Sequence, residues 1–322
     1  MEYLFDVTAL GELLIDFTQN GLSDQGNPLF EANPGGAPAN VLAMLRKLGK
    51  KCAFVGKVGS DSFGDQLEDT LKDADIETRG LLRDPVIPTT LAVVHTFPNG
   101  DRDFSFYRKP GADVLLSKEE LPMDIIEGSK VFHFGTLSLT SEPCRSATQA
   151  ALAAARAAGA VISFDPNLRP PLWDSEDETK EQISWGLSNC DFVKIADNEV
   201  LFMTGTDDFD KGAAILYERF PNIKMLNITA GPDGSYSYYR GRKVFEPALK
   251  LGGTIETTGA GDTFCACVIN FVLEHGLDGL TDDDLHSMLR YANTAAYIVT
   301  TKKGAIRSMP DPADVEKLLA LN

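Results

Sequence analysis

Short apolar runs rich in β-branched and aromatic residues alternate along the chain with longer segments whose apolar residues recur every three or four positions. The first pattern predicts strands and the second predicts amphipathic helices. A helix expected at 63–74 follows Asp61 and Ser62, which are typical N-cap residues, and another at 39–48 ends at Gly49. Expected strands lie at 5–9, 52–56, 131–134, 161–164, 192–195 and 225–228, and further expected helices lie at 145–158, 179–187, 263–275, 284–300 and 313–321. Strands separated by helices predict an α/β fold with a doubly wound, mostly parallel sheet flanked by helices.

Two stretches interrupt this alternation, at about 13–34 and about 89–109. In the second stretch, β-prone runs at 91–97 and 102–107 flank Asn99-Gly100, a strong short-range signal for a β-hairpin. Such a hairpin is either an edge decoration or part of a small β-sheet lid that covers a substrate site and excludes water. We therefore predict a single domain over 1–322, with a small β-sheet lid formed by these two insertions.

Composition and charge limit the partners and the compartment. The 322 residues are 43% hydrophobic and carry a formal net charge of −17. A binder of nucleic acid or of an anionic membrane should be basic, so we expect neither partner, and a phosphate would have to be held by local N–H groups and a few cations. Residues 1–6 do not resemble a signal peptide, and the most apolar run, 264–273, is much shorter than the ~20 residues of a membrane helix. We expect a cytoplasmic protein whose five cysteines are reduced and packed in the core.

The segment Thr258-Gly259-Ala260-Gly261-Asp262 leads directly into an apolar helix. Small or absent side chains at 259–261 let backbone N–H groups approach an anion closely, and the positive end of the helix dipole adds to the attraction. Asp262 lies at the same helix start, where its ionised form is favoured. The segment is suited to hold a phosphoryl group and to accept a proton from a hydroxyl. An N-capping aspartate after a glycine turn is the simpler interpretation of this segment alone.

A second glycine-containing segment, Gly35-Gly36-Ala37-Pro38-Ala39-Asn40, opens another helix. The two glycines permit unusual backbone angles and close approach of a ligand, and the amide of Asn40 is one turn into the helix. Short fixed donors and acceptors of this kind suit a small polyol. Asp16 follows three apolar residues and is either an exposed strand end or an acceptor for sugar hydroxyls. A plain turn with Pro38 at the helix start remains the alternative.

Three more segments follow expected strands, where ligands bind in doubly wound sheets. Arg169, after the strand at 161–164, is a candidate for a phosphate or a sugar hydroxyl, or pairs with Asp165 or Asp174. Glu199, in Lys194-Ile-Ala-Asp-Asn-Glu199, could hold Mg²⁺ through water or be an exposed acid at a helix start. Thr229-Ala-Gly231-Pro-Asp-Gly234 turns into a hairpin, and its glycines allow an adenine or ribose to lie on the backbone.

Together these segments resemble the ribokinase-like, or PfkB, family of carbohydrate kinases over nearly the whole chain. Gly-Gly-x-x-x-Asn at 35–40 and Thr-Gly-Ala-Gly-Asp at 258–262 carry the resemblance, and both occur in the expected order. The segments at 11–16, 35–40, 106–108, 142–146 and 165–169 are most similar to fructokinases.

The resemblance implies transfer of the γ-phosphoryl group of ATP to a sugar hydroxyl, converting fructose to fructose 6-phosphate, with Mg²⁺ as cofactor and a homodimer paired through the β-lids. The catalytic base would be Asp262, and the anion hole would be formed by Gly259, Ala260 and Gly261. The sugar or the transferred phosphate would be bound by Asp16, Gly35, Gly36, Asn40, Arg108 and Arg169. The nucleotide pocket would be lined by Thr229, Gly231, Gly234 and Asn293. Other acceptors in the same family are 2-keto-3-deoxygluconate, ribose and nucleosides.

Two positions depart from the family pattern. Ala196 stands where the family often has Asn or Ser, three residues before the acid of its magnesium-linked motif, so only Glu199 is left to act through water. Glu256 stands where the family usually has an Asp that helps to hold a monovalent cation, which leaves a dependence on K⁺ open; carbonyls near Val299, Lys302 and Gly304 are further candidates.

Two other classes of protein were weighed against a kinase. A catalytically silent sugar or nucleotide sensor would not need Asp262 or the intact glycine turn. A nicotinamide-dependent oxidoreductase would need G-x-G-x-x-G after the first strand, and Gly11-Glu12-Leu13 does not provide it.

Overall fold

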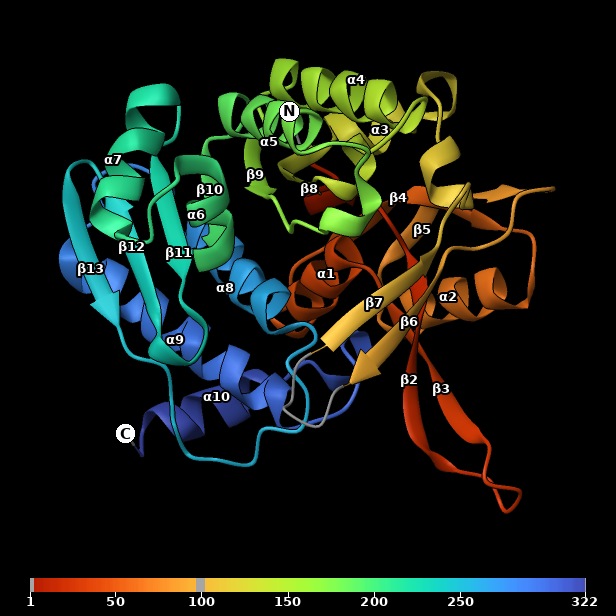
Figure 1. The fold of residues 1–322 in the computed structure, drawn as a ribbon. Coiled ribbons are helices and arrows are strands. Elements are labelled where there is room, and N and C mark those ends of the chain that lie inside the picture. Colours follow the sequence, from red (N-terminus) through yellow and green to blue (C-terminus); the bar gives the residue numbers. More distant parts are fainter. Residues whose placement is uncertain (1–2, 97–101, 322) are drawn as a thin grey trace.

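A computed structural model describes residues 3–96 and 102–321. Its centre is a nine-stranded sheet (Figure 1). In spatial order the strands are β13 (Arg242–Glu246), β12 (Ser235–Tyr239), β11 (Met225–Thr229), β10 (Phe192–Ala196), β9 (Val161–Asp165), β8 (Ser129–Gly135), β1 (Phe5–Leu10), β4 (Cys52–Gly59) and β5 (Glu77–Asp84). Neighbouring strands from β11 to β5 are parallel, and β12 and β13 add an antiparallel hairpin. The predicted doubly wound, mostly parallel sheet is therefore confirmed.

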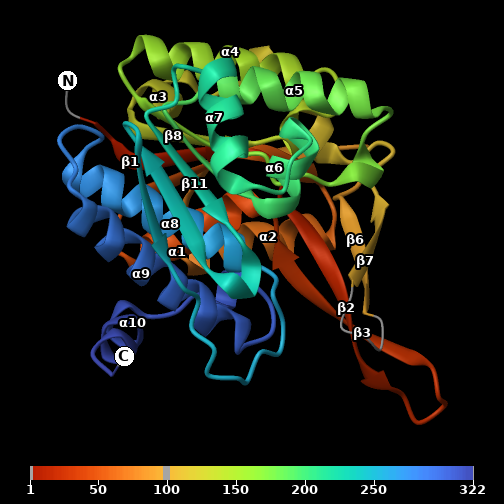
Figure 2. The same ribbon diagram turned by 60° about the vertical axis from the view of Figure 1, so that its left-hand side comes forward.

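Helices cover both faces of this sheet (Figure 2). One face carries α1 (Ala37–Lys47), α2 (Ser62–Asp73), α8 (Ala260–His275), α9 (Asp282–Thr300) and α10 (Pro312–Leu319). The other carries α3 (Met123–Glu127), α4 (Cys144–Ala157), α5 (Glu176–Ser188), α6 (Asp197–Thr204) and α7 (Phe209–Arg219). Each layer buries its own hydrophobic cluster against the sheet, and this burial is the main stabilising contribution to the fold.

Local sequence signals place several helix ends. Asp61 is the N-cap of α2, where its carboxylate accepts a hydrogen bond from the Gly64 N–H at 2.8 Å. Each predicted strand and helix occurs within a few residues of its expected position. No range was predicted for α3, β5, α6, α7 and β13: apolar and charged residues are mixed in β5, α7 and β13, while α3 and α6 are only five and eight residues long. All five cysteines are buried and free, as expected.

A second, four-stranded sheet projects from the large one (Figure 1). Its order is β3 (Pro28–Gly35), β2 (Leu14–Leu22), β6 (Leu91–Thr96) and β7 (Arg102–Tyr107). Both predicted insertions supply its strands, and β6 and β7 pair antiparallel as expected. The predicted Asn99-Gly100 turn lies outside the described residues. The small sheet is thus present, and its action as a lid stays a prediction.

In the described parts of the chain, none of the helices has the length and apolar character needed to cross a membrane.

Candidate active site

The carboxyl ends of several central strands meet the N-termini of α1 and α8 around one cavity of about 590 Å³. Ligands in doubly wound sheets bind at such strand ends, where the direction of strand addition reverses, and here the reversal occurs at β1. The lining residues come from segments far apart in sequence: Glu12, Leu14, Asp16, Gly36, Ala37, Asn40, Phe106, Leu137, Asn167, Leu168, Arg169, Lys194, Ala196, Asn198, Glu199, Thr257, Thr258, Gly259, Gly261 and Asp262. We refer to it below as the polar cavity.

The start of α8 forms one wall of the polar cavity. Gly259 is the N-cap residue and has φ of 81°, a left-handed conformation that disfavours a side chain. The turn therefore brings the first N–H groups of a sixteen-residue helix to the cavity wall, together with the positive end of its dipole. Asp262 lies in the first turn beside them. The predicted anion-binding turn and the carboxylate next to it are thus in one place.

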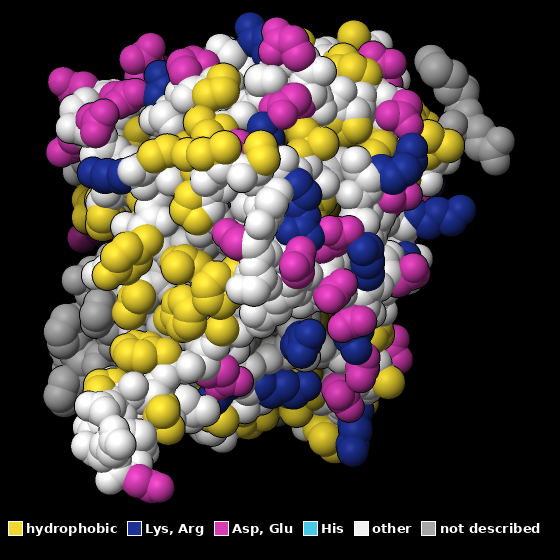
Figure 3. Space-filling model, turned by 90° about the vertical axis from the view of Figure 1, so that its right-hand side faces the viewer, with side chains coloured by type: hydrophobic (Ala, Val, Ile, Leu, Met, Phe, Trp, Pro, Cys, Tyr) yellow, Lys and Arg dark blue, Asp and Glu magenta, His cyan; other side chains and the backbone are white. Residues whose placement is uncertain are grey.

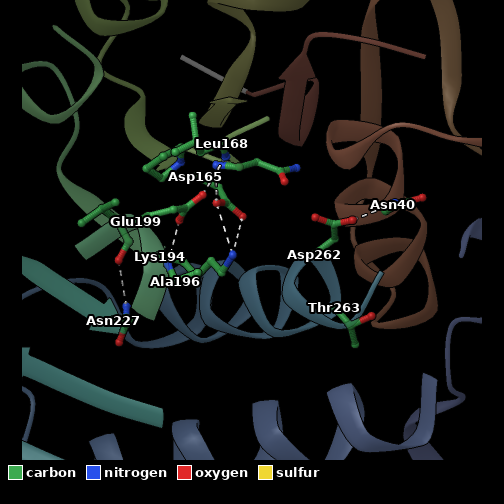
Figure 4. Close-up of polar contacts among 12 residues, drawn as sticks. Asn40, Asp165, Leu168, Lys194, Ala196, Glu199, Asn227, Asp262 and Thr263 are labelled. Carbon is green, nitrogen blue, oxygen red and sulfur yellow. Dashed lines mark hydrogen bonds and ion pairs between the residues drawn. The ribbon is translucent and has the colours of Figure 1, made fainter. Parts of the chain in front are cut away.

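Asp262 is joined to the second predicted motif by a hydrogen bond. The Nδ2 amide of Asn40 donates to Oδ2 of Asp262 at 2.7 Å (Figure 4). Burial raises the pKa of Asp262 above its ordinary value, and the Asn40 amide and the positive charges of Lys194 and Arg169 offset this only in part. The expectation that the helix start favours the ionised form was therefore wrong, because burial outweighs it. The Oδ1 of Asn40 is buried and has no hydrogen-bond partner among the described residues. A buried acceptor of this kind needs a donor, which a ligand hydroxyl can supply.

Close backbone packing surrounds Asp16 on the opposite wall. A Cβ at Gly35 would lie 2.5 Å from Oδ2 of Asp16, so a side chain there would displace the carboxylate. Gly36 has φ of 120°, and a Cβ there would lie 2.4 Å from the carbonyl oxygen of Glu12. Burial, together with the charges of Glu256 and Asp262, raises the pKa of Asp16 to about 7 against the attraction of Arg169. Asp16 is thus poised to change charge near neutral pH.

A buried cluster of charges lies beside α8 (Figure 4). Lys194 Nζ is 3.3 Å and 3.2 Å from the two carboxylate oxygens of Asp165. Glu199 accepts hydrogen bonds from the N–H groups of Leu168 and Ala196, each at 2.7 Å. Glu199 is therefore a buried acid that ties two strand ends together, and the interpretation as an exposed helix acid was wrong.

A second cavity of about 400 Å³ adjoins the polar one on the far side of the α8 N-terminus. It contains all four residues predicted for the nucleotide pocket, Thr229, Gly231, Gly234 and Asn293. Asn293 is fixed by Ser235 and by the carbonyl oxygens of Glu246 and Pro247, so it shapes the wall. Thr257 and Gly261 line both cavities. We refer to the second one as the apolar cavity, since Ala248, Leu249, Phe264, Ala296 and Tyr297 also line it.

The position of Arg108 differs from the prediction. Arg108 is only 7% exposed and forms an ion pair with Asp113 at 2.6 Å, with further bonds to Thr140 Oγ1 and the Leu137 carbonyl. It is not among the described residues that line the polar cavity, where Phe106, two residues earlier in β7, is found instead. The buried Asp113 carboxylate thus holds the guanidinium in an ion pair away from the cavity lining. Arg169 does line the cavity, and its Nη1 donates a hydrogen bond to the Leu168 carbonyl.

The acids considered for metal binding already have partners. Both oxygens of Glu199 accept backbone N–H groups, which leaves their other lone pairs for a metal-bound water. Glu256 is buried and accepts hydrogen bonds from Thr258 Oγ1 at 2.6 Å and from the Gly304 N–H at 3.1 Å. The residues described by the structure contain no cluster of three or more His, Cys, Asp or Glu side chains that could hold a metal ion by themselves. Glu199 therefore fits a cation that is also held by water and a ligand phosphate.

Sequence analysis missed several residues of the polar cavity. Glu12 is buried, and its Oε1 accepts a hydrogen bond from the Ala37 N–H at 2.9 Å, which fixes the start of α1. Lys194 lies inside an apolar strand, and Phe106 and Leu137 belong to hydrophobic runs. A charged residue within a buried strand, as at Lys194, was the one signal that could have been used.

Two cavities that meet at a helix N-terminus, beside a buried carboxylate, are what a phosphoryl-transfer enzyme for a small polyol requires. Comparison with known proteins agrees with this class. The family model described as pfkB family carbohydrate kinase matches residues 5–312, and the chain belongs to this family of sugar kinases.

Individual relatives cover almost the whole chain. Fructokinase-2 of Zea mays is 41% identical over 316 residues, which are 98% of this chain and 94% of that protein. The crystal structure of fructokinase from Xylella fastidiosa with bound ATP has a TM-score of 0.86 and 30% identity, and the match covers 98% of both chains. A double-mutant fructokinase from Vibrio cholerae O395, crystallised with fructose, ADP and a potassium ion, has a TM-score of 0.86 and 28% identity over 99% of both chains.

Proposed function

We propose that this sugar kinase phosphorylates fructose to fructose 6-phosphate with ATP, and that Asp262 is the base. The observation that carries the proposal is the junction of the two cavities at Gly261, next to the hydrogen-bonded pair of Asn40 and Asp262. A sugar in the polar cavity and a nucleotide in the apolar cavity would have their reacting groups at this junction. The fructokinases that align with nearly all of the chain support fructose as the acceptor.

The chemistry then follows from the chain's own groups. The sugar hydroxyl attacks the γ-phosphorus in line, and Asp262 takes up its proton. Asn40 keeps the Asp262 carboxylate oriented through the 2.7 Å hydrogen bond, and the N–H groups at the start of α8 stabilise the charge on the phosphoryl oxygens. Asp16, the Asn40 Oδ1 and the backbone at Gly35 and Gly36 would bind sugar hydroxyls.

A bound Mg²⁺ would neutralise charge on the β- and γ-phosphates, and Glu199 would hold it through water. Glu256 is the residue proposed to act near a monovalent cation. Its carboxylate accepts hydrogen bonds from Thr258 and Gly304 and so joins these two segments. K⁺ would therefore act on segments that are already held together without the ion.

The proposal is tested by measuring ADP release from Mg-ATP with fructose, ribose, 2-keto-3-deoxygluconate, glucose and adenosine, with and without K⁺. We expect turnover with a preference for fructose. Asp262→Asn should lower kcat by about 10²–10⁴-fold, because the hydroxyl loses its proton acceptor. Asp283→Asn, an exposed acid in the first turn of α9, is the matched control and should keep the activity.

Each other outcome removes one part of the proposal. Preference for another sugar would contradict fructose as the acceptor but would agree with the proposed phosphoryl transfer. A normal kcat in Asp262→Asn would contradict the assignment of Asp262 as the base. A chain that binds these ligands without turnover would be a sensor and not a kinase.

We also propose that two copies pair through the small sheet. The hairpin formed by β2 and β3 carries three exposed apolar side chains: Leu22 is 62% exposed, Leu29 47% and Phe30 46%. Figure 3 shows hydrophobic side chains gathered on the side of the molecule that carries this sheet. Apolar patches of this kind are typical of interfaces. The cytoplasmic location expected from the sequence stays a prediction.

A further inference from the structure

The two cavities differ sharply in charge. The residues described as lining the apolar cavity include no charged side chain. The polar cavity is lined by the acids Glu12, Asp16, Glu199 and Asp262 and by two cations, Arg169 and Lys194. A polyphosphate that extends from the apolar cavity therefore meets its first side-chain cation at or beyond the junction. In a chain with a net charge of −17, that cation has a large effect on phosphate binding.

Lys194 is the cation that the fold brings to the junction. A Cβ placed on Gly261 would lie only 3.1 Å from Nζ of Lys194, so the ammonium group rests against the backbone turn that lines both cavities. Gly261 has no side chain to come between the ammonium and an anion bound at the turn. Arg169 also lines the polar cavity and not the apolar one, as Lys194 does, but the side chain found within 4 Å of that Cβ is Lys194, and Arg169 Nη1 bonds to the Leu168 carbonyl.

The surroundings of Lys194 keep it charged and in place. The side chain enters from β10 and is buried, with Nζ between the carboxylate of Asp165 and the α8 turn (Figure 4). Burial disfavours the ammonium, but the carboxylates of Asp165, Glu199 and Asp262 more than offset this and raise the pKa of Lys194. The contacts to Asp165, at 3.2 and 3.3 Å, are longer than typical charge-assisted hydrogen bonds. An ammonium has three N–H donors, so it can bind a second anion without leaving Asp165.

We infer that Lys194 contacts the γ-phosphoryl group of ATP at the cavity junction and is a catalytic residue of the phosphoryl transfer. This inference rests on the proposed kinase reaction and adds a residue to it. Lys194 donates hydrogen bonds to a non-bridging γ-phosphate oxygen and keeps its own proton. The sugar oxygen forms the new bond to phosphorus, the bond to the β-phosphate oxygen breaks with its electron pair on ADP, and the hydroxyl proton moves to Asp262.

A second buried lysine provides a matched control. Lys57 on β4 is also buried, at 6% exposure, and pairs with Glu120 at 2.6 Å, but it is not among the described residues that line either cavity. Lys57→Met therefore reports the effect of removing a buried, ion-paired lysine from the same sheet. Lys194→Met reports that effect and, in addition, the loss of the phosphate contact.

The test compares the affinities for ATP and ADP by calorimetry, together with kcat for fructose. ADP lacks the γ-phosphate, so Lys194→Met should weaken ATP binding by about 10–100-fold and change ADP binding little. Its kcat should fall by about 10²–10³-fold, the range for removing one donor to a transition-state anion. Lys57→Met should leave the ratio of ATP to ADP affinity unchanged.

Lys194→Met leaves Asp165 as an unpaired buried charge, and the variant can unfold for that reason alone. A double variant is therefore also measured. Asp165→Asn/Lys194→Met removes both charges, and it should fold and show the same loss of preference for ATP. Asp165→Asn alone keeps the ammonium and should keep that preference. Equal weakening of ATP and ADP, or a kcat equal to that of Lys57→Met, would overturn the role of Lys194. Wild-type protein that phosphorylates no sugar would instead contradict the proposed function.

Discussion

At the scale of single residues, the site depends on acids whose environment controls their charge. Asp16 is the clearest case, since its pKa is raised from an ordinary value of 3.8 to about 7. In the folded protein Asp16 is thus protonated below about pH 7 and ionised above it. The ionised carboxylate is a charged acceptor at both oxygens for the donors of a sugar, whereas protonation removes the charge and turns one oxygen into a donor.

We therefore expect the KM for fructose to rise as the pH falls through 7. If only the ionised form binds, KM increases by roughly tenfold for each pH unit below the pKa. Steady-state kinetics from about pH 5.5 to about pH 8.5 measure the effect. Asp16→Asn should have a higher KM that no longer depends on pH in this range. A wild-type KM that is constant across the range would contradict the assignment of Asp16 to sugar binding.

Two of the cavity residues that were predicted from the sequence, Asn40 and Asp262, stand close to glycines. Both residues follow glycine turns. Such turns can be recognised in a sequence because their positive φ values, as at Gly36 and Gly259, disfavour other residues. Lys194 has no glycine beside it, and Glu12 was not identified although it follows Gly11. Their roles depend on partners that are distant in sequence, Asp165 and Ala37, and only the folded chain brings these together.

At the scale of elements, the connection between the two sheets is a buried polar network. Arg108 follows β7, and Asp113 lies in the short 3₁₀ helix Ala112–Leu115. Asp113 also accepts a hydrogen bond from Thr90, which precedes β6, at 2.5 Å. Both ends of the β6–β7 hairpin are therefore fastened to one carboxylate. This use of Arg108 could not be predicted, because the network forms only when the hairpin is docked.

Removing Arg108 should destabilise the protein strongly. Arg108→Met leaves Asp113 buried without its cation, and we expect the free energy of unfolding to fall by about 3–5 kcal/mol. Urea denaturation measures the change. Arg79→Met, which removes an exposed ion pair to Asp124, should lower it by less than about 1 kcal/mol. The double variant Arg108→Met/Asp113→Leu should recover much of the loss, and its failure to do so would argue against the ion pair as the cause.

At the scale of the whole molecule, periodicity predicted the layers but not the order of strands. A buried strand looks the same in sequence whatever its neighbours are, so the placement of β1 between β8 and β4 had to come from the structure. The same limit applies to the small sheet. Its two insertions were visible as breaks in the pattern, while the parallel pairing of β2 with β6, which joins them, was not.

Pairing of two copies through the small sheet is tested by sedimentation. We expect the wild-type protein to sediment as a dimer and Phe30→Glu to shift it towards the monomer, because a charge is then buried in an apolar interface. Leu321→Glu, which changes an exposed apolar residue at the other end of the fold, should remain dimeric. A wild-type protein that is monomeric at all concentrations, or a Phe30→Glu variant that is still fully dimeric, would exclude this interface.

The division of the two cavities along the chain has a consequence for how such an enzyme diversifies. Apart from the shared turn at 257–262, residues between 12 and 199 line the polar cavity, and residues between 229 and 300 line the apolar one. Substitutions among the polar-cavity residues that precede Lys194 can therefore alter acceptor recognition while the residues of the apolar cavity are inherited unchanged. A gene for such a protein can acquire a new substrate through changes in that part of its length, with the shared turn under selection from both ligands.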